Sequence, residues 1–301
     1  MTYTEAIQTQ GLSKDYGQGH GLFDLDLTVH RGEICGFLGP NGAGKSTTMR
    51  LLLDLISPTS GSARLMDLDT HGASLEARRR VGFLPGEFAL YPKLTGAAVL
   101  DYLAHVRGGV DRRVRDQLAE RFDAQLDRPL HQLSTGNRQK VGLIQAFMHE
   151  PELLILDEPI AGLDPLVQQS FHALLGEVAS QGRTVFLSSH TLSEVERVAD
   201  RVAILREGRL VAMDTLESLR AVAVRRLEIE FAGARPEPAQ LEALPDVREA
   251  VLHDTHMVVA FEGSADALVK AIAPYEVLSI RSQDDELESI FLQYYRGGDQ
   301  S

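Results

Sequence analysis

Polar and apolar residues follow two different periods along this chain, and these periods predict strands and helices in turn. Residues 22–30, LFDLDLTVH, alternate with period two, as a half-buried strand does. The next stretch, EICGFLG at 33–39, is continuously apolar and runs into glycine, which is typical of a short buried strand. A helix is predicted over KSTTMRLLLDLI (45–56), and it ends before Ser57-Pro58 because the residue that precedes a proline avoids the helical conformation.

Further along, strands and helices continue to alternate. ELLILD (152–157) and RTVFLSS (183–189) predict two apolar strands with a helix near 166–180 between them. Such alternation indicates a parallel sheet covered by helices on both faces. The intervening part is mostly helical, and we interpret about 87–150 as a helical subdomain inserted in the α/β core. Its predicted helices lie near 95–107, 113–122 and 137–149.

The pattern changes after about residue 222, where short strands alternate with short helices and no glycine-rich loop occurs. This alternation of short strands and helices predicts a small α+β domain without a catalytic motif. We therefore expect two domains, a nucleotide-binding α/β domain at 1–221 and an accessory α+β domain at 222–301.

Composition excludes several classes of protein. The chain has 301 residues, of which 44% are hydrophobic, and this is enough for one large domain with a smaller one attached. Its net charge of −13 argues against nucleic acid as the main partner. The sequence has no run of 18 apolar residues and no secretory signal, so we expect an intracellular chain without a membrane span. The single cysteine, Cys35, excludes a disulfide framework and is expected to be a small buried hydrophobic residue.

A glycine-rich loop between the apolar strand and the first helix carries the strongest chemical signal. Residues 39–46 read GPNGAGKS and fit the pattern G-x-x-x-x-G-K-[ST], with a strand before it and a helix after it. In such a loop, backbone N–H groups wrap the β-phosphate, Lys45 neutralises the β- and γ-oxygens, and the Ser46 hydroxyl ligates Mg²⁺. We expect a nucleoside triphosphate site formed by Gly39, Pro40, Asn41, Gly42, Ala43, Gly44, Lys45, Ser46 and Thr47.

Acidic and basic side chains follow the next two strands of the predicted sheet. Asp157 and Glu158 are adjacent at a strand end, so their side chains point in opposite directions if the strand geometry continues. Hydrolysis needs one carboxylate to hold Mg²⁺, which we assign to Asp157, and one general base, which we assign to Glu158. His190 ends the following strand and is expected at the same sheet edge, where it would contact the γ-phosphate. The predicted catalytic residues are thus Lys45, Glu158 and His190, and the predicted metal ligands are Ser46 and Asp157.

The polar turn LSTGN (133–137) is a second place suited to an anion. It lies at the N-terminus of the helix predicted near 137–149, where unpaired N–H groups and the helix dipole favour negative charge. The same residues are also compatible with an ordinary helix cap formed by Ser134 or Asn137.

In their order, the motifs GPNGAGKST, LSTGN, LLILDEP, AGLD and SSH resemble those of the ATP-binding cassette (ABC) family, the nucleotide-binding subunits of ABC transporters, over about residues 4–220. The resemblance implies a P-loop NTPase fold of the ABC ATPase type, an ATPase activity, and ATP with Mg²⁺ as cofactors. It implies that Tyr16 stacks on the adenine. It also implies that two cassettes pair around two ATP molecules, so that each nucleotide meets the signature turn of the other chain. The residues that would act on the partner's ATP are Ser134, Thr135, Gly136, Asn137 and Asp164.

The C-terminal domain, the LPGE sequence and LSTGNRQKVGLIQA are similar to the ATPases of type-2 bacterial exporters, including the branch for drugs and peptide antibiotics. This likeness implies a homodimer, or a pair of cassettes, that drives transport through separate transmembrane permease subunits. The chain would then be cytoplasmic and peripheral on the inner face of the cell membrane. The stretch around 87–110 is the expected docking surface, and a plain packing subdomain is the alternative. The exported molecule cannot be predicted, because residues of the membrane subunits select it.

Several residues depart from the family pattern. Gly86 stands where the family usually has a glutamine that reaches the metal, so Glu87 or water would have to replace that ligand. Thr135 and Asn137 replace a glycine and a glutamine of the signature turn. Because the phosphate-loop lysine, the two carboxylates and the histidine are all present, we expect an active ATPase.

Two alternatives remain open at this point. One is a soluble cassette ATPase of the translation or DNA-repair type, which usually carries two cassettes or long coiled coils that this chain lacks. The other is a regulatory module that binds ATP and rarely hydrolyses it.

Overall fold

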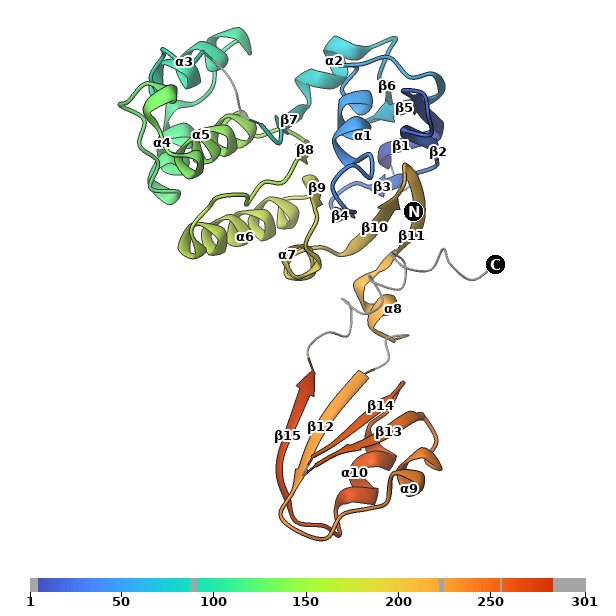
Figure 1. Ribbon diagram of the computed structural model, residues 1–301. Helices are drawn as coiled ribbons and strands as arrows, with labels where there is room; N and C mark the ends of the chain where they lie inside the picture. The colour runs from blue at the N-terminus through green and yellow to red at the C-terminus, as the bar shows by residue number, and fades with distance from the viewer. Residues whose placement is uncertain (1–4, 88–90, 222–224, 255, 284–301) are drawn as a thin grey trace. The chain divides into compact units, whose positions relative to one another are not determined.

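The computed structural model describes residues 5–87, 91–221, 225–254 and 256–283 (Figure 1). The chain divides into two compact units, Met1–Met213 and Asp214–Ser301. None of the helices among these residues is both long enough and apolar enough to cross a membrane.

A six-stranded sheet forms the centre of the first unit, in the order β11-β10-β4-β9-β8-β7. The five strands from β10 to β7 run parallel. Every residue of β4, β8 and β9 is buried, which explains why these strands are continuous apolar runs in the sequence. The strands are β4 (Ile34–Leu38), β7 (Val81–Leu84), β8 (Leu153–Leu156), β9 (Thr184–Ser189), β10 (Arg201–Arg206) and β11 (Arg209–Thr215).

A second, antiparallel sheet in this unit has the order β2-β1-β5-β6, with β3 also paired to β1. Helix α1 (Lys45–Leu52) contributes to a single apolar core that joins both sheets and includes Phe37, Met49 and Phe186. Helix α1 is shorter than the predicted 45–56, because Leu53 caps its end and Asp54 then adopts a left-handed conformation. The strands are β1 (Glu5–Asp15), β2 (Gly21–Leu25), β3 (Thr28–His30), β5 (Ser60–Leu65) and β6 (Leu68–Asp69).

The prediction of one strand over residues 22–30 is wrong, because the chain forms two strands there, β2 and β3. Side chains interrupt the backbone pairing with β1 at this point. The Thr9 hydroxyl donates to Leu25 O at 2.7 Å and accepts from Leu27 N at 2.9 Å, while the Asp26 carboxylate accepts from Gly11 N at 2.7 Å. Period-two alternation continues through such a break, so the hydrophobic pattern alone does not reveal it.

Three helices form a group at the β7 end of the six-stranded sheet (Figure 1). They are α3 (Gly96–Val106), α4 (Arg112–Arg121) and α5 (Thr135–Phe147), and both α3 and α4 contact α5. Each begins after a residue whose side chain accepts a backbone N–H, namely Thr95, Asp111 or Ser134. The prediction placed the third helix near 137–149, and it starts two residues earlier because Ser134 is the cap. The other helices of the unit are α2 (Ser74–Arg79), α6 (Pro165–Ser180) and α7 (Leu192–Glu196).

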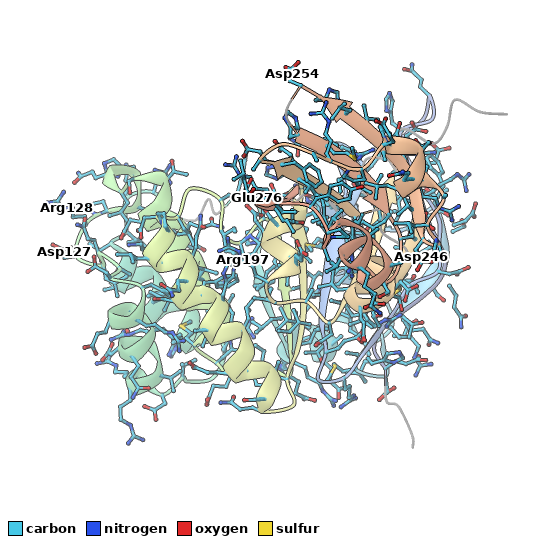
Figure 2. The ribbon with its side chains drawn as sticks, turned by 90° about the horizontal axis from the view of Figure 1, so that it is seen from below. Asp127, Arg128, Arg197, Asp246, Asp254 and Glu276 are labelled. Atoms are coloured by element: carbon cyan, nitrogen blue, oxygen red, sulfur yellow. The ribbon has the colours of Figure 1, made fainter. Side chains whose placement is uncertain are left out.

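The second unit begins with α8 (Leu216–Ala221) and contains an antiparallel sheet in the order β13-β14-β12-β15. Its β-α-β-β-α-β succession is that of a ferredoxin-like domain. Apolar residues of the sheet and of both later helices form its core, including Ile229, Met257 and Leu268. Charged side chains such as Asp246, Asp254 and Glu276 are exposed, and Asp254 projects away from the ribbon in Figure 2. The elements are β12 (Arg225–Phe231), α9 (Pro238–Glu242), β13 (Val247–His253), β14 (His256–Phe261), α10 (Asp266–Ile272) and β15 (Val277–Gln283).

Candidate active site

A cavity of about 550 Å³ opens at the edge of the six-stranded sheet where the parallel strands end. Loops that follow β4, β7, β8 and β10 all reach it, because the carboxyl ends of parallel strands lie at one edge. The lining residues that the sequence singled out are Tyr16, Pro40, Asn41, Gly42, Gly44, Lys45, Ser46, Thr47, Gly86, Asp157 and Glu158. Four others, Gly19, His20, Gly21 and Glu207, were not predicted.

The loop after β4 needs its glycines for two different reasons. Gly42 and Gly44 have φ angles of 84° and 109°, which residues with a β-carbon rarely adopt. Gly39 has an ordinary φ, but a β-carbon there would lie 2.6 Å from the carbonyl oxygen of Leu205. Gly39 is therefore required by packing against β10, and the other two glycines are required by the path of the loop itself.

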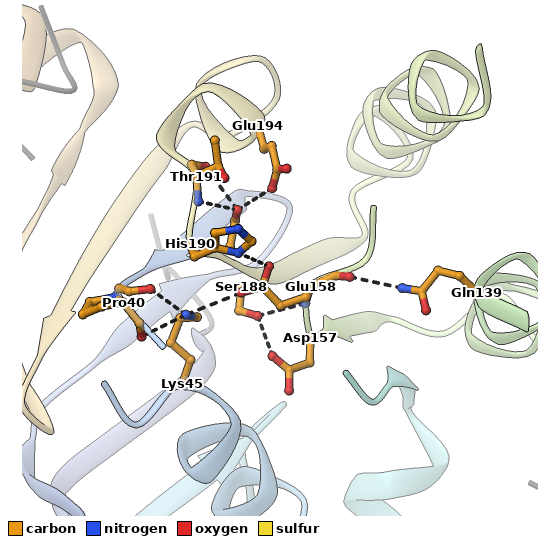
Figure 3. Close-up of polar contacts among 11 residues, drawn as sticks. Pro40, Lys45, Gln139, Asp157, Glu158, Ser188, His190, Thr191 and Glu194 are labelled. Carbon is orange, nitrogen blue, oxygen red and sulfur yellow. Dashed lines mark hydrogen bonds and ion pairs between the residues drawn. The ribbon is translucent and has the colours of Figure 1, made fainter. Parts of the chain in front are cut away.

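Lys45 begins helix α1, and its side chain folds back over the loop (Figure 3). Its ammonium group donates to Gly39 O at 2.6 Å and Pro40 O at 3.3 Å, and it lies 3.5 Å from Glu158 Oε1. Only 6% of this residue is exposed. A buried cation at the phosphate loop that also lines the cavity is suited to binding phosphate oxygens.

Asp157 and Glu158 follow β8 and point to different partners, although the strand geometry on which the sequence expectation depended does not continue to Glu158 (Figure 3). Asp157 Oδ1 accepts from the Ser188 hydroxyl at 2.6 Å, and the same hydroxyl oxygen accepts from Glu158 N at 3.0 Å. Ser188 lies on β9, is completely buried, and thus connects the two acidic residues. Glu158 itself has a left-handed backbone with φ 49°.

His190 follows β9, and its Nδ1 lies 2.8 Å from Glu158 Oε2. The two carboxylate oxygens of Glu158 therefore contact Lys45 on one side and His190 on the other. The His190 side chain is 55% exposed, so part of its ring remains open to a ligand. The structure brings together the three residues that the sequence predicted as catalytic.

The other predicted nucleotide residues lie around this group. Tyr16 lies at the mouth of the cavity, 57% exposed, with the Lys14 ammonium 5.7 Å from its ring centroid. An exposed ring at a cavity mouth is free to stack on a flat base. Gly39 and Ala43 are buried behind the lining and shape the loop without lining the cavity.

Sequence analysis missed Ser188 and Glu207. Both carried a signal that could have been used: Ser188 is a polar residue within an apolar strand, two positions before His190, and Glu207 directly follows β10 at the same sheet edge. His20 and its neighbouring glycines gave no comparable signal, because the antiparallel sheet brings them to the cavity from a distant turn.

The predicted signature residues do not line this cavity in the part of the chain that the structure describes. Ser134 caps α5 by accepting from Asn137 N at 3.1 Å. Asn137 is 7% exposed, and its side chain accepts from Gln125 N at 2.8 Å and donates to Gln125 O at 2.7 Å. Its amide is therefore occupied within its own chain, whereas Thr135 and Gly136 remain at the start of the helix.

Asp164 caps helix α6 by accepting from Val167 N at 3.0 Å, and this hydrogen bond holds the pKa of the Asp164 carboxyl below its usual range. The signature turn lies against the segment before Asp164, since a β-carbon on Gly136 would be 2.5 Å from Gly162 O. The five residues predicted to act on a second nucleotide thus belong to two adjoining segments outside the described cavity.

Gly86 lines the cavity beside Asp157, and a β-carbon there would lie 3.2 Å from Asp157 Oδ2. Glu87, the substitute ligand considered from the sequence, is exposed and is not part of the lining. The position where the family pattern has a glutamine therefore offers no side chain to the cavity.

Comparison with known proteins identifies the family. The ABC transporter family model matches residues 22–161. The bacitracin transport ATP-binding protein BcrA of Enterococcus faecalis is 33% identical over 99% of both chains. The daunorubicin/doxorubicin resistance ATP-binding protein DrrA of Streptomyces peucetius is 35% identical over 79% of this chain and 74% of its own. A solved ATP-binding subunit of an ABC transporter is 32% identical, with a TM-score of 0.67 over 71% of this chain and 92% of its own.

The chain belongs to the ABC transporter family, as one of its ATP-binding and ATP-hydrolysing subunits. The relatives do not favour the soluble translation-type or repair-type ATPase that the sequence left open.

Proposed function

We propose that this ABC transporter subunit pairs with a second copy around two Mg²⁺–ATP and powers export of a peptide antibiotic or a related drug through separate membrane subunits. The likeness to the bacitracin protein over nearly the whole of both chains supports this substrate class. In the proposed arrangement, residues 1–221 form the cassette, residues 222–301 form the accessory domain, and the pair lies on the inner face of the membrane.

The observation that carries the catalytic proposal is the contact of Glu158 with both Lys45 and His190, at 3.5 and 2.8 Å. In the proposed mechanism, Lys45 binds the β- and γ-phosphate oxygens and His190 binds the γ-phosphate. Glu158 accepts the proton of the attacking water. Because Glu158 lies between Lys45 and His190, which both bind the γ-phosphate in this mechanism, that water would lie beside the γ-phosphate.

The residues at the cavity also fit a magnesium ion. Asp157 is 5% exposed and uses Oδ1 for Ser188, so Oδ2 lies on the side of Gly86 and the cavity. We assign Asp157 and the Ser46 hydroxyl as the protein ligands, because Mg²⁺ in such sites is held by one or two protein oxygens together with phosphate and water. The ion would neutralise charge on the phosphate oxygens.

The placement of the signature turn supports pairing of two chains. Ser134, Thr135 and Gly136 lie at the N-terminus of α5, outside the cavity that the same chain forms. Helix N-termini favour phosphate, so a second chain related by a two-fold axis could present this turn to the nucleotide. Asn137 would contribute through the backbone of the turn, because its side chain is bound to Gln125.

A groove of about 710 Å³ between α2, α3 and α5 is the proposed docking site for the membrane subunit. It presents two exposed apolar side chains, Leu75 at 63% and Val106 at 64%, next to Arg78, Arg79 and Arg107. We therefore expect a cytoplasmic segment with apolar and acidic side chains. The sequence-based docking surface, 87–110, includes residues 88–90, which lie outside the described residues, and the groove adds α2 to that surface.

Affinity purification tests the proposal. Glu158→Gln, tagged and expressed in the native host with ATP and Mg²⁺ present, should retain a membrane protein with several apolar spans, detected by mass spectrometry. Adding Val106→Glu should release that protein without changing ATP binding. Leu55→Glu is the matched control, because Leu55 is 54% exposed and is not among the residues that line the groove. Recovery of the chain alone would contradict the exporter proposal, and equal recovery from both charge variants would contradict the groove.

A further inference from the structure

The segment from Glu158 to Asp164 lies along the first two turns of helix α5. Gln139 Nε2 donates to Glu158 O at 3.1 Å and to Pro159 O at 3.0 Å (Figure 3). Gly136 lies directly against the carbonyl oxygen of Gly162, and Lys140 Nζ lies 3.8 Å from an oxygen of Asp164. Helix α5 and this segment are therefore connected at three successive points.

The backbone of Glu158 is held on both sides by side chains. Its φ of 49° is unfavourable for a residue with a β-carbon, so neighbouring groups must stabilise it. Ser188 on β9 accepts from its N–H, and Gln139 on α5 donates to its carbonyl oxygen. The direction of the Glu158 carboxylate thus depends on one side chain from the parallel sheet and one from the helical group.

Gln139 is suited to this position because it is buried and its amide faces two carbonyl groups. Only 6% of the residue is exposed, and both hydrogen bonds use the nitrogen of its amide. An apolar side chain of the same length would leave both carbonyl oxygens without this donor, and a carboxylate would face them with like charge.

We propose that Gln139 is a positioning residue that sets the orientation of Glu158 and links it to the signature turn on the same helix. Ser134 and Gly136 begin α5, and Gln139 follows about one turn later. A displacement of α5 against a partner's nucleotide would therefore also move the backbone of the chain's own general base. The proposal rests on the proposed role of Glu158 in hydrolysis.

The experiment compares Gln139→Met with wild type in steady-state ATP hydrolysis by the full chain. Met has a similar length and no donor, so kcat should fall about 10- to 100-fold, as expected when a catalytic group is misplaced by a fraction of an ångström to 1 Å. KM for ATP and binding of a non-hydrolysable analogue should stay unchanged, because Gln139 does not line the cavity. Gln139→Glu should lower kcat further.

Thr9→Val is the matched control. Thr9 is 3% exposed and, like Gln139, makes two hydrogen bonds to backbone atoms at a break in regular structure. Both variants should lower the melting temperature by similar amounts, but only Gln139→Met should lower kcat. A loss of kcat in both, or in neither, would overturn the positioning role.

A double variant separates this inference from the proposed role of Glu158. If Gln139 acts through Glu158, then Gln139→Met should cause no further loss in single-turnover rate when Glu158 is already Gln. A further fall by the same factor as in wild type would contradict the inference. Full activity of Glu158→Gln alone would instead contradict the role of Glu158 as the base. A loss of kcat in Gln139→Met would then arise through a group other than Glu158, which also contradicts the inference.

Discussion

In the first unit, the buried side chains include Lys45, Asp157, Gln139 and Ser188, whereas the described part of the second unit buries only apolar side chains. Burying a polar group costs free energy unless it is hydrogen-bonded, and burying a charge costs more. The parallel sheet offsets this free-energy cost, because several strands end at one edge and the polar side chains there form hydrogen bonds and ion pairs with one another. The antiparallel sheet of the second unit instead places its charged groups on an open face.

The charged residues on that open face meet as pairs and do not converge. Glu228 lies 3.7 Å from His256, and Glu230 accepts from Ser279 at 3.2 Å, all at least partly exposed. Such exposed pairs contribute about 0–1 kcal/mol each. The comparison teaches that residue type does not make a site: both units contain Glu, His and Ser, and only the first connects them in one shared network, through the buried Ser188.

The largest expected effect compares two glutamates. Glu158→Gln removes the proposed general base and should lower the hydrolysis rate about 10²- to 10⁴-fold, while ATP binding persists. Glu228→Gln, which makes the same chemical change beside a histidine in the second unit, should leave the rate unchanged. A release assay for inorganic phosphate and a nucleotide-binding titration measure the two quantities. Equal rates in the two variants would remove Glu158 as the base.

The next effect compares two serines. Ser188→Ala leaves Asp157 Oδ1 and Glu158 N without their shared partner in a buried place, so it should cost about 1–3 kcal/mol of unfolding free energy. It should also lower kcat about 10-fold and raise the Mg²⁺ concentration needed for half-maximal rate. Urea unfolding and magnesium titrations at saturating ATP measure these changes.

Ser279→Ala is the control for that variant, because its hydroxyl reaches Glu230 on the open face of the second sheet. It should change stability by less than about 0.5 kcal/mol and leave the rate alone. Ser188→Thr keeps the hydroxyl and should recover part of the activity. A Ser188→Ala protein with wild-type kcat and magnesium response would show that the serine only fills space.

The sequence predicted those parts of the site whose residues are neighbours along the chain. The loop from Gly39 to Thr47 is one continuous pattern, and Asp157 and His190 mark the ends of apolar strands, so a parallel sheet brings them together by rule. Gln139 was missed as a site residue because its partner lies 19 positions away, and hydrophobic periodicity contains no information on such a pair. The split between β2 and β3 was missed for the same reason, since Thr9 causes it from another strand.

The smallest effect concerns stability and leaves the rate unchanged. His149 lies partly buried two residues after the end of α5, with Nε2 3.2 Å from Val81 O. Burial, with the Arg107 charge nearby, lowers the pKa of His149 from 6.5 to about 4. Between these values the unfolded chain binds a proton that the folded chain does not, so stability is complete above pH 6.5 and is lost as the pH falls toward 4. The loss should be at most about 1.4 kcal/mol per pH unit.

His149→Gln cannot titrate, so urea midpoints measured from pH 7.5 to 4.5 should fall less steeply in this variant than in wild type. The same slope in both proteins would mean that His149 has the same pKa in the folded and the unfolded chain, which would contradict the effect of burial.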